Sequence, residues 1–468
     1  MSLPYPLTCK TTLFSWQESG VEKLKPIRVG ALFMEQGTGK TRTAIELVNL
    51  RQHLIDKVVY FCPVSLKDTI YHQILEHTYT TPDQICVLDD TTTESNLPGA
   101  NWYIVGIESL SGSSRVTMAV NALVTSETMC IVDESDYIKG HKALRTERIT
   151  RIAERCRYRL LLTGTPISQG VVDLFSQMRF LSPQILGYRS FYSFAANHLE
   201  YSEKYPGLVV RGLKTDWLAQ KMQPYVYQVT KAECMDLPEK LYTSLYFSLS
   251  PEQSRAYQLA KEELLLSVDE PSSYDIFRTF TALQQIVSGY WNHNRQIEEY
   301  AHLRLDQLLH YVSSIDSKII VWCKFQYSVN QIAGSLRQIY GKDSTSEFHG
   351  KLSEDKRNQQ ITNFRNESRF LVATQSSGGR GLTLTESHHA AFYENEFRYS
   401  NRLQAEDRQH RFGTTMPVTY CNLWSDSGID RLIAKSQDKK GNAVRDFKLQ
   451  VDRVKNDKKM REKMIQDL

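Results

Sequence analysis

Short apolar runs bounded by polar or turn residues recur along the first third of the chain. They lie at Val29 to Met34, Val58 to Cys62, Trp102 to Ile107, Met129 to Asp133 and Leu160 to Thr163. The runs are continuous rather than alternating, which is typical of strands that helices cover on both faces. The pattern therefore predicts a doubly wound parallel sheet of the α/β class.

A second set of strand-like runs follows in the C-terminal half, with helical patterns between them. We expect strands at Lys318 to Cys323, Phe370 to Ala373, Ala390 to Tyr393 and Val418 to Trp424, and helices at Ser328 to Tyr340 and Ser353 to Phe364. This succession repeats the design of the first sheet. The chain is therefore expected to hold two tandem parallel-sheet lobes.

Between the two sets the pattern changes to longer helix-like segments, such as Pro251 to Val268 and Tyr274 to Tyr290. We interpret this part as a mostly helical insertion attached to both lobes. The tail from Ser436 alternates basic and acidic residues around scattered apolar ones, which favours a helix packed on the first lobe over a free basic arm. The predicted domains are lobe 1 at 1–182, the insertion at 183–315, lobe 2 at 316–435 and a terminal helix at 436–468.

The amino-acid composition excludes few classes of protein. Lysine and arginine total 57 against 53 aspartate and glutamate, so a net charge of +4 does not by itself indicate DNA binding, and any basic surface must be local. The eight cysteines form no Cys-x-x-Cys pair and several lie in apolar runs. They are expected to be reduced core residues rather than zinc ligands or disulfides.

Targeting segments are not evident in the chain. No apolar run approaches the roughly 18 residues of a membrane span, and the N-terminus lacks the apolar core of a signal peptide. We expect a soluble monomer, without a membrane partner, in the cytoplasm of a bacterial or phage-infected cell.

A phosphate-binding loop is predicted directly after the first strand. It reads Gln36-Gly37-Thr38-Gly39-Lys40-Thr41 and is followed by the helix-forming stretch Ala44 to Val48. Glycines let backbone N–H groups close on phosphate oxygens at a helix N-terminus, where a lysine binds the terminal phosphates and a hydroxyl binds Mg²⁺. Met34 stands where the strict pattern has glycine, so the match is to the shorter Gly-x-Gly-Lys-Thr form. ATP and Mg²⁺ are the expected ligands.

Paired carboxylates end the strand Met129 to Asp133. Asp133 is suited to holding Mg²⁺, and Glu134 to orienting and deprotonating the attacking water. An acidic turn after a strand is the alternative interpretation, and the presence of Lys40 disfavours it.

Two arginines three residues apart, Arg408 and Arg411, would share one face if their segment is helical. Such a pair can neutralise charge on a transferred phosphoryl group. An exposed helix with ordinary salt bridges is the alternative. A further candidate is Gln17, whose amide can pair with the edge of adenine, although a surface glutamine is equally compatible with the sequence.

In this order the segments resemble superfamily 2 helicase-like ATPases, and within them the Swi/Snf-type branch of double-stranded DNA translocases. The resemblance covers nearly the whole chain and rests also on Thr163-Gly164-Thr165-Pro166, on Leu237-Pro238-Glu239-Lys240, and on the stretch from Gln404 to Gly413. It implies two RecA-like lobes with an ATP site in the cleft between them. An RNA helicase is disfavoured, because DEAD-box enzymes have Ser-Ala-Thr at the Thr163 position.

The chain departs from this family at several positions. Asp136 replaces the usual histidine of the Asp-Glu-x-His element, Thr414 replaces a glutamine, and Tyr227-Gln228 stands where an arginine pair is common. These changes put the coupling between lobes in question more than hydrolysis. The compact length is similar to small phage and bacterial members, some of which remodel forks or migrate branches.

The resemblance also implies DNA contacts and coupling residues. The implied contacts are Ser65, Lys67 and Ser109 in the first lobe, and Lys324, His349, Lys351, Thr374 and Ser376 in the second. Thr163, Thr165, Arg380 and Gln404 would link the nucleotide state to the position of the lobes, and Gly381, like Arg42, joins the nucleotide-binding set. Contacts to phosphates give affinity without reading sequence, as a moving protein requires.

Together these features predict a DNA-dependent ATPase that acts on double-stranded, forked or branched DNA. Translocation would drive fork reversal, branch migration or strand separation, with a wedge in the insertion. The alternative is a nucleotide-gated DNA-binding or loading module that hydrolyses little ATP.

Overall fold

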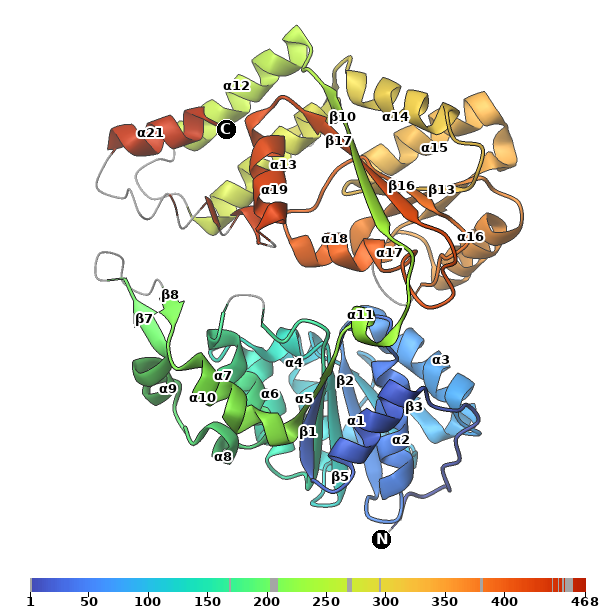
Figure 1. The fold of residues 1–468 in the computed structure, drawn as a ribbon, viewed down its shortest axis with the longest axis vertical. Helices are drawn as coiled ribbons and strands as arrows, with labels where there is room; N and C mark the ends of the chain where they lie inside the picture. The colour runs from blue at the N-terminus through green and yellow to red at the C-terminus, as the bar shows by residue number, and fades with distance from the viewer. Residues whose placement is uncertain are drawn as a thin grey trace. The chain divides into compact units, whose positions relative to one another are not determined.

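The computed structural model describes residues 2–167, 170–202, 209–266, 272–293, 296–378, 382–439, 441–444, 446–447, 450 and 458–468. The chain divides into two compact units, unit 1 (Met1–Asp236) and unit 2 (Leu237–Leu468) (Figure 1). Within the described ranges no helix is long and apolar enough to cross a membrane.

Unit 1 is built on a seven-stranded parallel sheet with the order β3-β4-β2-β5-β6-β1-β9. Its strands are β1 (Val29–Met34), β2 (Lys57–Cys62), β3 (Ile85–Val87), β4 (Trp102–Gly106), β5 (Thr128–Asp133), β6 (Tyr158–Leu162) and β9 (Val226–Val229). Successive residues of β1 enter different cores, Ala31 and Phe33 on one face and Leu32 and Met34 on the other. Both faces are therefore buried, which explains the continuous apolar runs.

Helices cover both faces of this sheet (Figure 1). One face packs against α1 (Ser15–Leu24), α2 (Lys40–Arg51) and α3 (Lys67–His77). The other packs against α4 (Ser109–Gly112), α5 (Ser114–Leu123), α6 (Leu144–Ala153), α7 (Val172–Leu181), α8 (Pro183–Leu186), α9 (Phe191–His198) and α10 (Thr215–Met222). A two-stranded hairpin of β7 (Leu199–Tyr201) and β8 (Val209–Gly212) and the short helix α11 (Lys231–Cys234) complete the unit.

Unit 2 has a six-stranded parallel sheet with the order β10-β17-β16-β13-β15-β14. Its strands are β10 (Lys240–Phe247), β13 (Ile319–Cys323), β14 (Thr345–Phe348), β15 (Phe370–Thr374), β16 (His389–Phe392) and β17 (Val418–Ser425). Its helices are α12 (Pro251–Leu266), α13 (Ser273–Val287), α14 (Leu303–Ser313), α15 (Gln326–Tyr340), α16 (Glu354–Asn366), α17 (Gln375–Gly378), α18 (Tyr399–Glu406), α19 (Gly428–Asp438) and α21 (Lys458–Gln466), and a hairpin pairs β11 (Tyr290–His293) with β12 (Gln296–Glu299). The two predicted parallel sheets with helices on both faces are confirmed.

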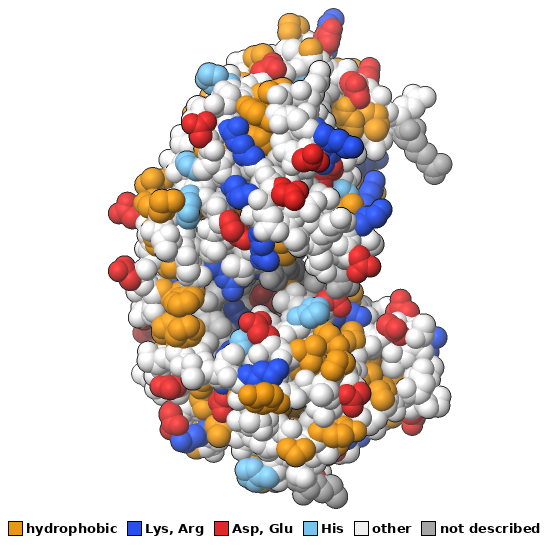
Figure 2. Space-filling model, turned by 90° about the vertical axis from the view of Figure 1, so that its right-hand side faces the viewer, with side chains coloured by type: hydrophobic (Ala, Val, Ile, Leu, Met, Phe, Trp, Pro, Cys, Tyr) orange, Lys and Arg blue, Asp and Glu red, His pale blue; other side chains and the backbone are white. Residues whose placement is uncertain are grey.

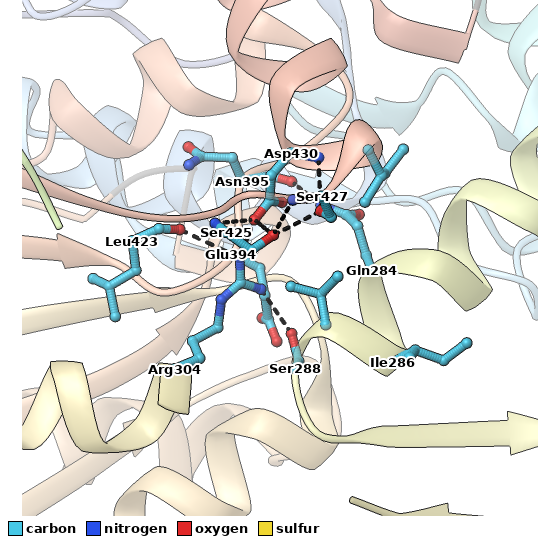
Figure 3. A network of polar contacts seen from close by, with 12 residues as sticks. Gln284, Ile286, Ser288, Arg304, Glu394, Asn395, Leu423, Ser425, Ser427 and Asp430 are labelled. Carbon is cyan, nitrogen blue, oxygen red and sulfur yellow. Dashed lines mark hydrogen bonds and ion pairs between the residues drawn. The ribbon is translucent and has the colours of Figure 1, made fainter. Parts of the chain in front are cut away.

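A buried ion pair ties α14 to α19 within unit 2 (Figure 3). Arg304 is 1% exposed and donates to Asp430 at 2.7 Å, to Ser288 Oγ at 2.9 Å and to the carbonyl of Leu423 at 3.3 Å. Asp430 also accepts hydrogen bonds from Ser425. The two terminal nitrogens of the guanidinium therefore join the end of α13, α14, β17 and α19 at one point, and Asp430 balances the buried charge.

The segment 183–315 does not form a separate body. Residues up to Asp236 belong to unit 1, where β9 extends the sheet beside β1, and later residues belong to unit 2, where β10 extends the sheet beside β17. Sequence patterns missed these two edge strands because tyrosine, glutamine and serine interrupt their apolar positions.

The terminal helix was expected on the first lobe, and this expectation was wrong. Helix α21 packs in unit 2, where Ile465 and Leu468 join the core and Tyr257 of α12 donates to the Leu468 carbonyl at 2.6 Å. The tail's apolar residues identify a packed helix, but charge and periodicity do not say which core receives it. The cysteines are free thiols, five of them buried: Cys62, Cys130, Cys156, Cys323 and Cys421.

Candidate nucleotide and DNA sites

The predicted phosphate loop lies between β1 and α2 in unit 1. Gly37 and Gly39 have φ values of 84° and 86°, a conformation that glycine adopts without steric cost, and α2 begins at Lys40. The first N–H groups of any α-helix have no partner within the helix. The loop therefore directs backbone donors and the positive end of the helix dipole at one place, as a phosphate site requires.

Gln17 supports this loop from α1. It is 3% exposed, its Nε2 lies 3.4 Å from the carbonyls of both Thr38 and Gly39, and its Oε1 accepts from the Phe14 N–H at 2.9 Å. Trp16 adds a hydrogen bond from Nε1 to the Thr38 carbonyl at 2.9 Å. The amide thus holds the loop in shape, and adenine recognition by Gln17 stays a prediction.

Lys40, Thr41 and Asp133 lie together at the carboxyl edge of the sheet. Asp133 accepts a hydrogen bond from the buried Tyr60 hydroxyl at 3.1 Å, and Thr41 also contacts that hydroxyl. Burial and the neighbouring Glu134 hold the pKa of Asp133 above its ordinary value, and the charge of Lys40 opposes them. The Lys40 ammonium donates to the Met34 carbonyl at 3.1 Å.

Glu134 has a left-handed backbone with φ of 49°, which is uncommon for a residue with a side chain. Its N–H donates to Asp133 Oδ1 at 2.9 Å. The backbone turns directly after the strand end and ties the second residue of the carboxylate pair back to the first. Such local strain is often found at functional sites.

The Thr163–Pro166 loop packs directly beside the phosphate loop. A Cβ atom at Gly164 would lie 3.2 Å from the Gln36 nitrogen and 3.4 Å from the Met34 carbonyl oxygen. Thr163 is fully buried, and its hydroxyl accepts from the Thr165 N–H at 3.1 Å. The structure therefore brings the two predicted coupling threonines next to the nucleotide loop.

Arg42 points away from this edge. Its guanidinium, 5% exposed, donates to the Thr11 carbonyl at 2.6 Å and pairs with Glu46 at 2.8 Å. These contacts fasten the N-terminal segment to α2. A nucleotide contact by Arg42 stays a prediction.

The donor set fits a nucleotide with Mg²⁺. Thr41 and Asp133 supply hydroxyl and carboxylate oxygens, which are the ligands that Mg²⁺ prefers, and Lys40 supplies a cation beside the backbone donors. Burial and the neighbouring Glu134 raise the pKa of the Asp133 carboxyl, and a bound cation would favour its charged form.

In unit 2 the two predicted arginines converge. Arg408 and Arg411 each donate from Nη1 to the carbonyl of Leu382, at 3.2 and 3.4 Å. Helix α18 ends at Glu406, so the two residues lie on the turns that follow and not on the helix. The turns nonetheless direct both guanidinium groups at one point. The predicted residues Arg380 and Gly381, which precede this point, lie outside the described residues.

Helix α18 holds the arginine segment through a buried charge cluster. Arg402 Nε pairs with Glu406 at 2.7 Å, and Glu406 also accepts from Lys240 at 3.0 Å and Tyr242 at 2.9 Å. Arg402 and Glu406 are each 3% exposed. Gln404 lies half-buried on the same helix. The strand β10, invisible in the sequence pattern, thus positions the segment that carries Arg408.

The candidate DNA contacts of unit 1 follow neighbouring strands. Ser65 comes after β2 and Ser109 after β4, and these strands pair in parallel. The Val64 N–H donates to the Glu108 carboxylate at 2.9 Å, which joins the two loops. Lys67 is half-buried and donates to the Leu88 carbonyl at 2.8 Å. The three residues therefore share one edge of the sheet.

The candidate contacts of unit 2 share the corresponding edge, after β13, β14 and β15. Lys351 and Ser376 are exposed, whereas His349 and Thr374 are buried. Burial lowers the pKa of His349. Exposed groups at this edge are therefore better placed to meet a phosphate than the two buried ones.

Lys324 has an unexpected environment for a DNA contact. Its ammonium lies 3.1 Å from the centre of the Phe397 ring and 5.2 Å from that of Phe325, and it donates to Gln284 at 2.6 Å. Burial lowers the pKa of Lys324, and Glu396 and Glu394 oppose this. The side chain is satisfied within unit 2, so a contact to DNA stays a prediction that requires it to leave this position.

On the face shown in Figure 2, Lys and Arg side chains are interspersed with Asp and Glu. This agrees with the modest net charge of +4. No broad basic field dominates this view, so phosphate contacts there would have to come from individual groups.

Sequence comparison decides the family. The SNF2-related domain matches residues 17–296, and the helicase conserved C-terminal domain matches residues 303–413. The chain belongs to the SNF2-related family. The expected resemblance to Swi/Snf-type proteins is confirmed, and the two sheets are those of an SNF2 helicase-like ATPase core.

Relatives of this SNF2-family chain are distant and longer. It is 23% identical over 433 residues to the chromodomain-helicase-DNA-binding protein 1-like of Danio rerio, which covers 85% of this chain and 40% of the relative. An uncharacterized ATP-dependent helicase of Mycoplasma pneumoniae is 24% identical, and the match covers 93% of this chain and 42% of the relative. The DNA annealing helicase and endonuclease ZRANB3 of Mus musculus is 23% identical, and the match covers 75% of this chain and 33% of the relative. The chain thus spans between a third and about two fifths of these relatives.

Among solved structures, the Sulfolobus solfataricus SWI2/SNF2 ATPase core in complex with dsDNA is similar in fold. It is 21% identical, with 99% of each chain covered and a TM-score of 0.46.

Two residues of the site escaped the sequence analysis. Tyr60, in the middle of an apolar run, orients Asp133, and Gln177, in an apolar helix, contacts Ser135 after the carboxylates and Pro166 in the Thr163–Pro166 loop. In the sequence, these two residues are marked only by a polar group within an otherwise apolar segment.

Proposed function

We propose that this SNF2-family chain is a DNA-dependent ATPase that moves along double-stranded or branched DNA. The observation that carries the proposal is the assembly of Lys40, Thr41, Asp133 and Glu134 around the glycine loop at one sheet edge. Family membership supports ATP hydrolysis. The DNA-annealing relative supports DNA as the partner.

In this proposal Lys40 and the backbone donors of the phosphate loop bind the terminal phosphates. Thr41 and Asp133 hold Mg²⁺, which neutralises phosphate charge when bound. Tyr60 fixes the orientation of Asp133 through the 3.1 Å hydrogen bond. Glu134, in the turn directly after Asp133, orients the attacking water and accepts its proton.

Arg408 and Arg411 provide the positive charge that stabilises the transferred phosphoryl group. They belong to unit 2 and Lys40 to unit 1. In this proposal both units contribute to one reaction, and DNA bound by both units promotes their joint action. Hydrolysis would then depend on DNA, and repeated cycles would give movement, with fork reversal, branch migration or strand separation as its products.

Steady-state ATP hydrolysis tests this proposal. It is measured without nucleic acid and with single strand, duplex, fork, four-way junction and RNA. Lys40→Ala serves as the inactive variant, and Lys25→Ala, on the surface of α1, is a matched control. Arg411→Ala should lower the DNA-stimulated rate by about 10³-fold or more, as known arginine fingers do, whereas the exposed Arg151→Ala should not change it.

Each outcome separates two functions. Strong stimulation by duplex or junction, lost in Lys40→Ala and Arg411→Ala, supports the translocase. Tight DNA binding that responds to ATP with negligible turnover would instead establish the nucleotide-gated binding module. Stimulation by RNA alone would exclude DNA as the partner.

A further inference from the structure

The side-chain amide of Gln177 makes three hydrogen bonds inside unit 1 and uses both of its N–H donors. Its Oε1 accepts from the Ser135 hydroxyl at 2.6 Å. Its Nε2 donates to the Pro166 carbonyl at 2.8 Å and to the Asp173 carbonyl of its own helix at 2.9 Å. Because both amide hydrogens face carbonyl groups, the amide oxygen can face only the serine.

The two loops that Gln177 contacts carry different parts of the proposed site. Ser135 follows Glu134, the candidate for orienting the attacking water. Pro166 follows Thr165 in the loop that packs beside the phosphate loop through Gly164. One side chain thus bridges a catalytic turn and a coupling loop that are separated by about 30 positions in the sequence.

The bridge is shielded from water. Gln177 and Ser135 are both fully buried. Water cannot readily replace a hydrogen bond lost at such a place, so displacement of either loop leaves a buried polar group without a partner. Loop movements that keep Ser135, Gln177 and Pro166 hydrogen-bonded therefore cost less free energy than movements that separate them.

A neighbouring ion pair holds the same helix turn. Lys139, just past the Glu134 turn, lies 3.9 Å from the Asp173 carboxylate, and Asp173 is 3% exposed. Helix α7 is therefore attached to the segment after Asp133 at two points, by the Ser135–Gln177 bond and by this pair.

We propose that Gln177 is a positioning residue that makes the Glu134 turn and the Thr163–Pro166 loop move as one body. The inference deepens the proposed function, since it assigns a route by which the state of the coupling loop reaches the residue that orients water. Among the described residues the Gln177 side chain has no hydrogen bond to the nucleotide loop or to the carboxylates, so we expect it to act through Ser135 and Pro166.

Hydrogen–deuterium exchange of the full chain tests the link without requiring turnover. Ser135→Ala should raise exchange of the Thr163, Gly164 and Thr165 amides by about threefold or more, although Ser135 does not contact them. Exchange in the strand Val58 to Cys62 should not change. Ser176→Ala is the matched control, because Ser176 is buried on the same helix and its hydroxyl has no hydrogen-bond partner among the described residues. A response confined to residues 134–138 would overturn the proposal.

Kinetics give a second readout. Ser135→Ala should lower the DNA-stimulated kcat about threefold to tenfold, the size expected for one buried hydrogen bond, and leave the KM for ATP within about twofold. The double variant Ser135→Ala, Gln177→Met should be no slower than Gln177→Met alone, since both changes break one link. Independent, multiplying losses would contradict a shared link.

The two proposals fail in different ways. If the wild-type chain does not hydrolyse ATP, the proposed function fails, and the exchange experiment still decides whether the loops are linked. If the wild type hydrolyses ATP and Ser135→Ala changes neither exchange nor kcat, only the role of Gln177 is rejected. Because Gln177→Met leaves buried polar groups unpaired and risks misfolding, Ser135→Ala is the principal variant.

Discussion

A Cβ atom on Gly39 would lie 1.9 Å from Nε2 of Gln17. Gln17 belongs to α1 and Gly39 directly precedes α2, and the glycine leaves the space in which the glutamine reaches the carbonyls of the phosphate loop. The loop and its support are therefore matched in shape, and neither keeps its position if the other changes size.

Gly39→Ala should consequently impair nucleotide binding. The substitution adds the clash with Gln17 to a positive φ that costs a residue with a side chain about 1 kcal/mol. We expect ATP affinity to fall at least about tenfold, and the free energy of unfolding to fall by about 1–3 kcal/mol. Titration calorimetry and urea denaturation measure the two effects.

Gly99→Ala is the control for this change, because a Cβ there meets no atom within 4 Å. It should leave both quantities unaltered. Normal ATP binding by Gly39→Ala would show that Gln17 does not shape the phosphate site.

The buried cluster around Glu406 predicts a strong effect on the stability of unit 2. Glu406→Gln removes the carboxylate that pairs with Arg402 and leaves Lys240 with only the longer pair to Asp407 at 3.7 Å, and loss of one member of a buried pair typically costs about 3–5 kcal/mol. Urea denaturation at pH 7 measures this loss. Glu386→Gln, in the more exposed pair with Arg365, should cost at most about 1 kcal/mol.

The same cluster predicts a pH dependence with a definite sign. Burial alone would raise the pKa of Glu406, but Arg402 and Lys240 outweigh it and hold the pKa below its ordinary value. As the pH falls, the unfolded chain therefore takes up this proton before the folded chain does. The contribution of Glu406 to the free energy of unfolding is complete above the ordinary carboxyl pKa and is lost as the pH falls through the pKa of Glu406 in the folded state. In Glu406→Gln the free energy of unfolding should depend less steeply on pH in this acidic range. An unchanged steepness would show that Glu406 is not the responsible group.

His302 predicts a second loss of stability at somewhat higher pH. Burial, aided by Arg304, lowers the pKa of His302 to about 4, against the opposing effect of Asp306. Above about pH 6.5 the imidazole is neutral in both states, and between that value and the folded pKa only the unfolded chain is protonated. The free energy of unfolding should therefore fall by up to about 3 kcal/mol across this window.

Denaturation of His302→Asn between pH 7 and pH 4 checks this expectation, and its curve should lack that part of the slope. His310→Asn, which changes an exposed histidine of the helix α14 that follows His302, provides the comparison. Equal slopes in the two variants would show that His302 is not the responsible group.

The two candidate lysines of unit 2 should respond differently to salt. Lys351 is exposed, so its removal should reduce the dependence of log Kd on log salt by about one unit if it contacts a phosphate. Lys324 is held by Phe397 and Gln284, so Lys324→Met should leave that slope unchanged. Duplex binding measured at several salt concentrations distinguishes them, and a lowered slope in Lys324→Met would mean that the ammonium leaves its aromatic contact to reach DNA.

Local sequence determined most of the two sheets and the arrangement around the phosphate loop. Continuous apolar runs mark strands buried on both faces, and β1 begins and ends where its run does. The order strand, glycine loop, lysine and helix needs only neighbouring residues, so the positive φ values of Gly37 and Gly39 could be anticipated from the sequence. The carboxylates at the end of β5 follow from the same rule, because parallel strands present their carboxyl ends at one edge.

Only the tertiary structure decided which distant residues meet. The edge strands β9 and β10 are stabilised by the neighbours they join, so their own patterns are weak. The terminal helix could have packed on either core by its sequence, and the Tyr257 contact places it in unit 2. Gln177 and Tyr60 look like ordinary members of apolar segments until folding puts Ser135 and Asp133 beside them. Hydrophobic periodicity records whether a position is buried, whereas the hydrogen bonds that position a catalytic group depend on atoms brought together from separate parts of the chain.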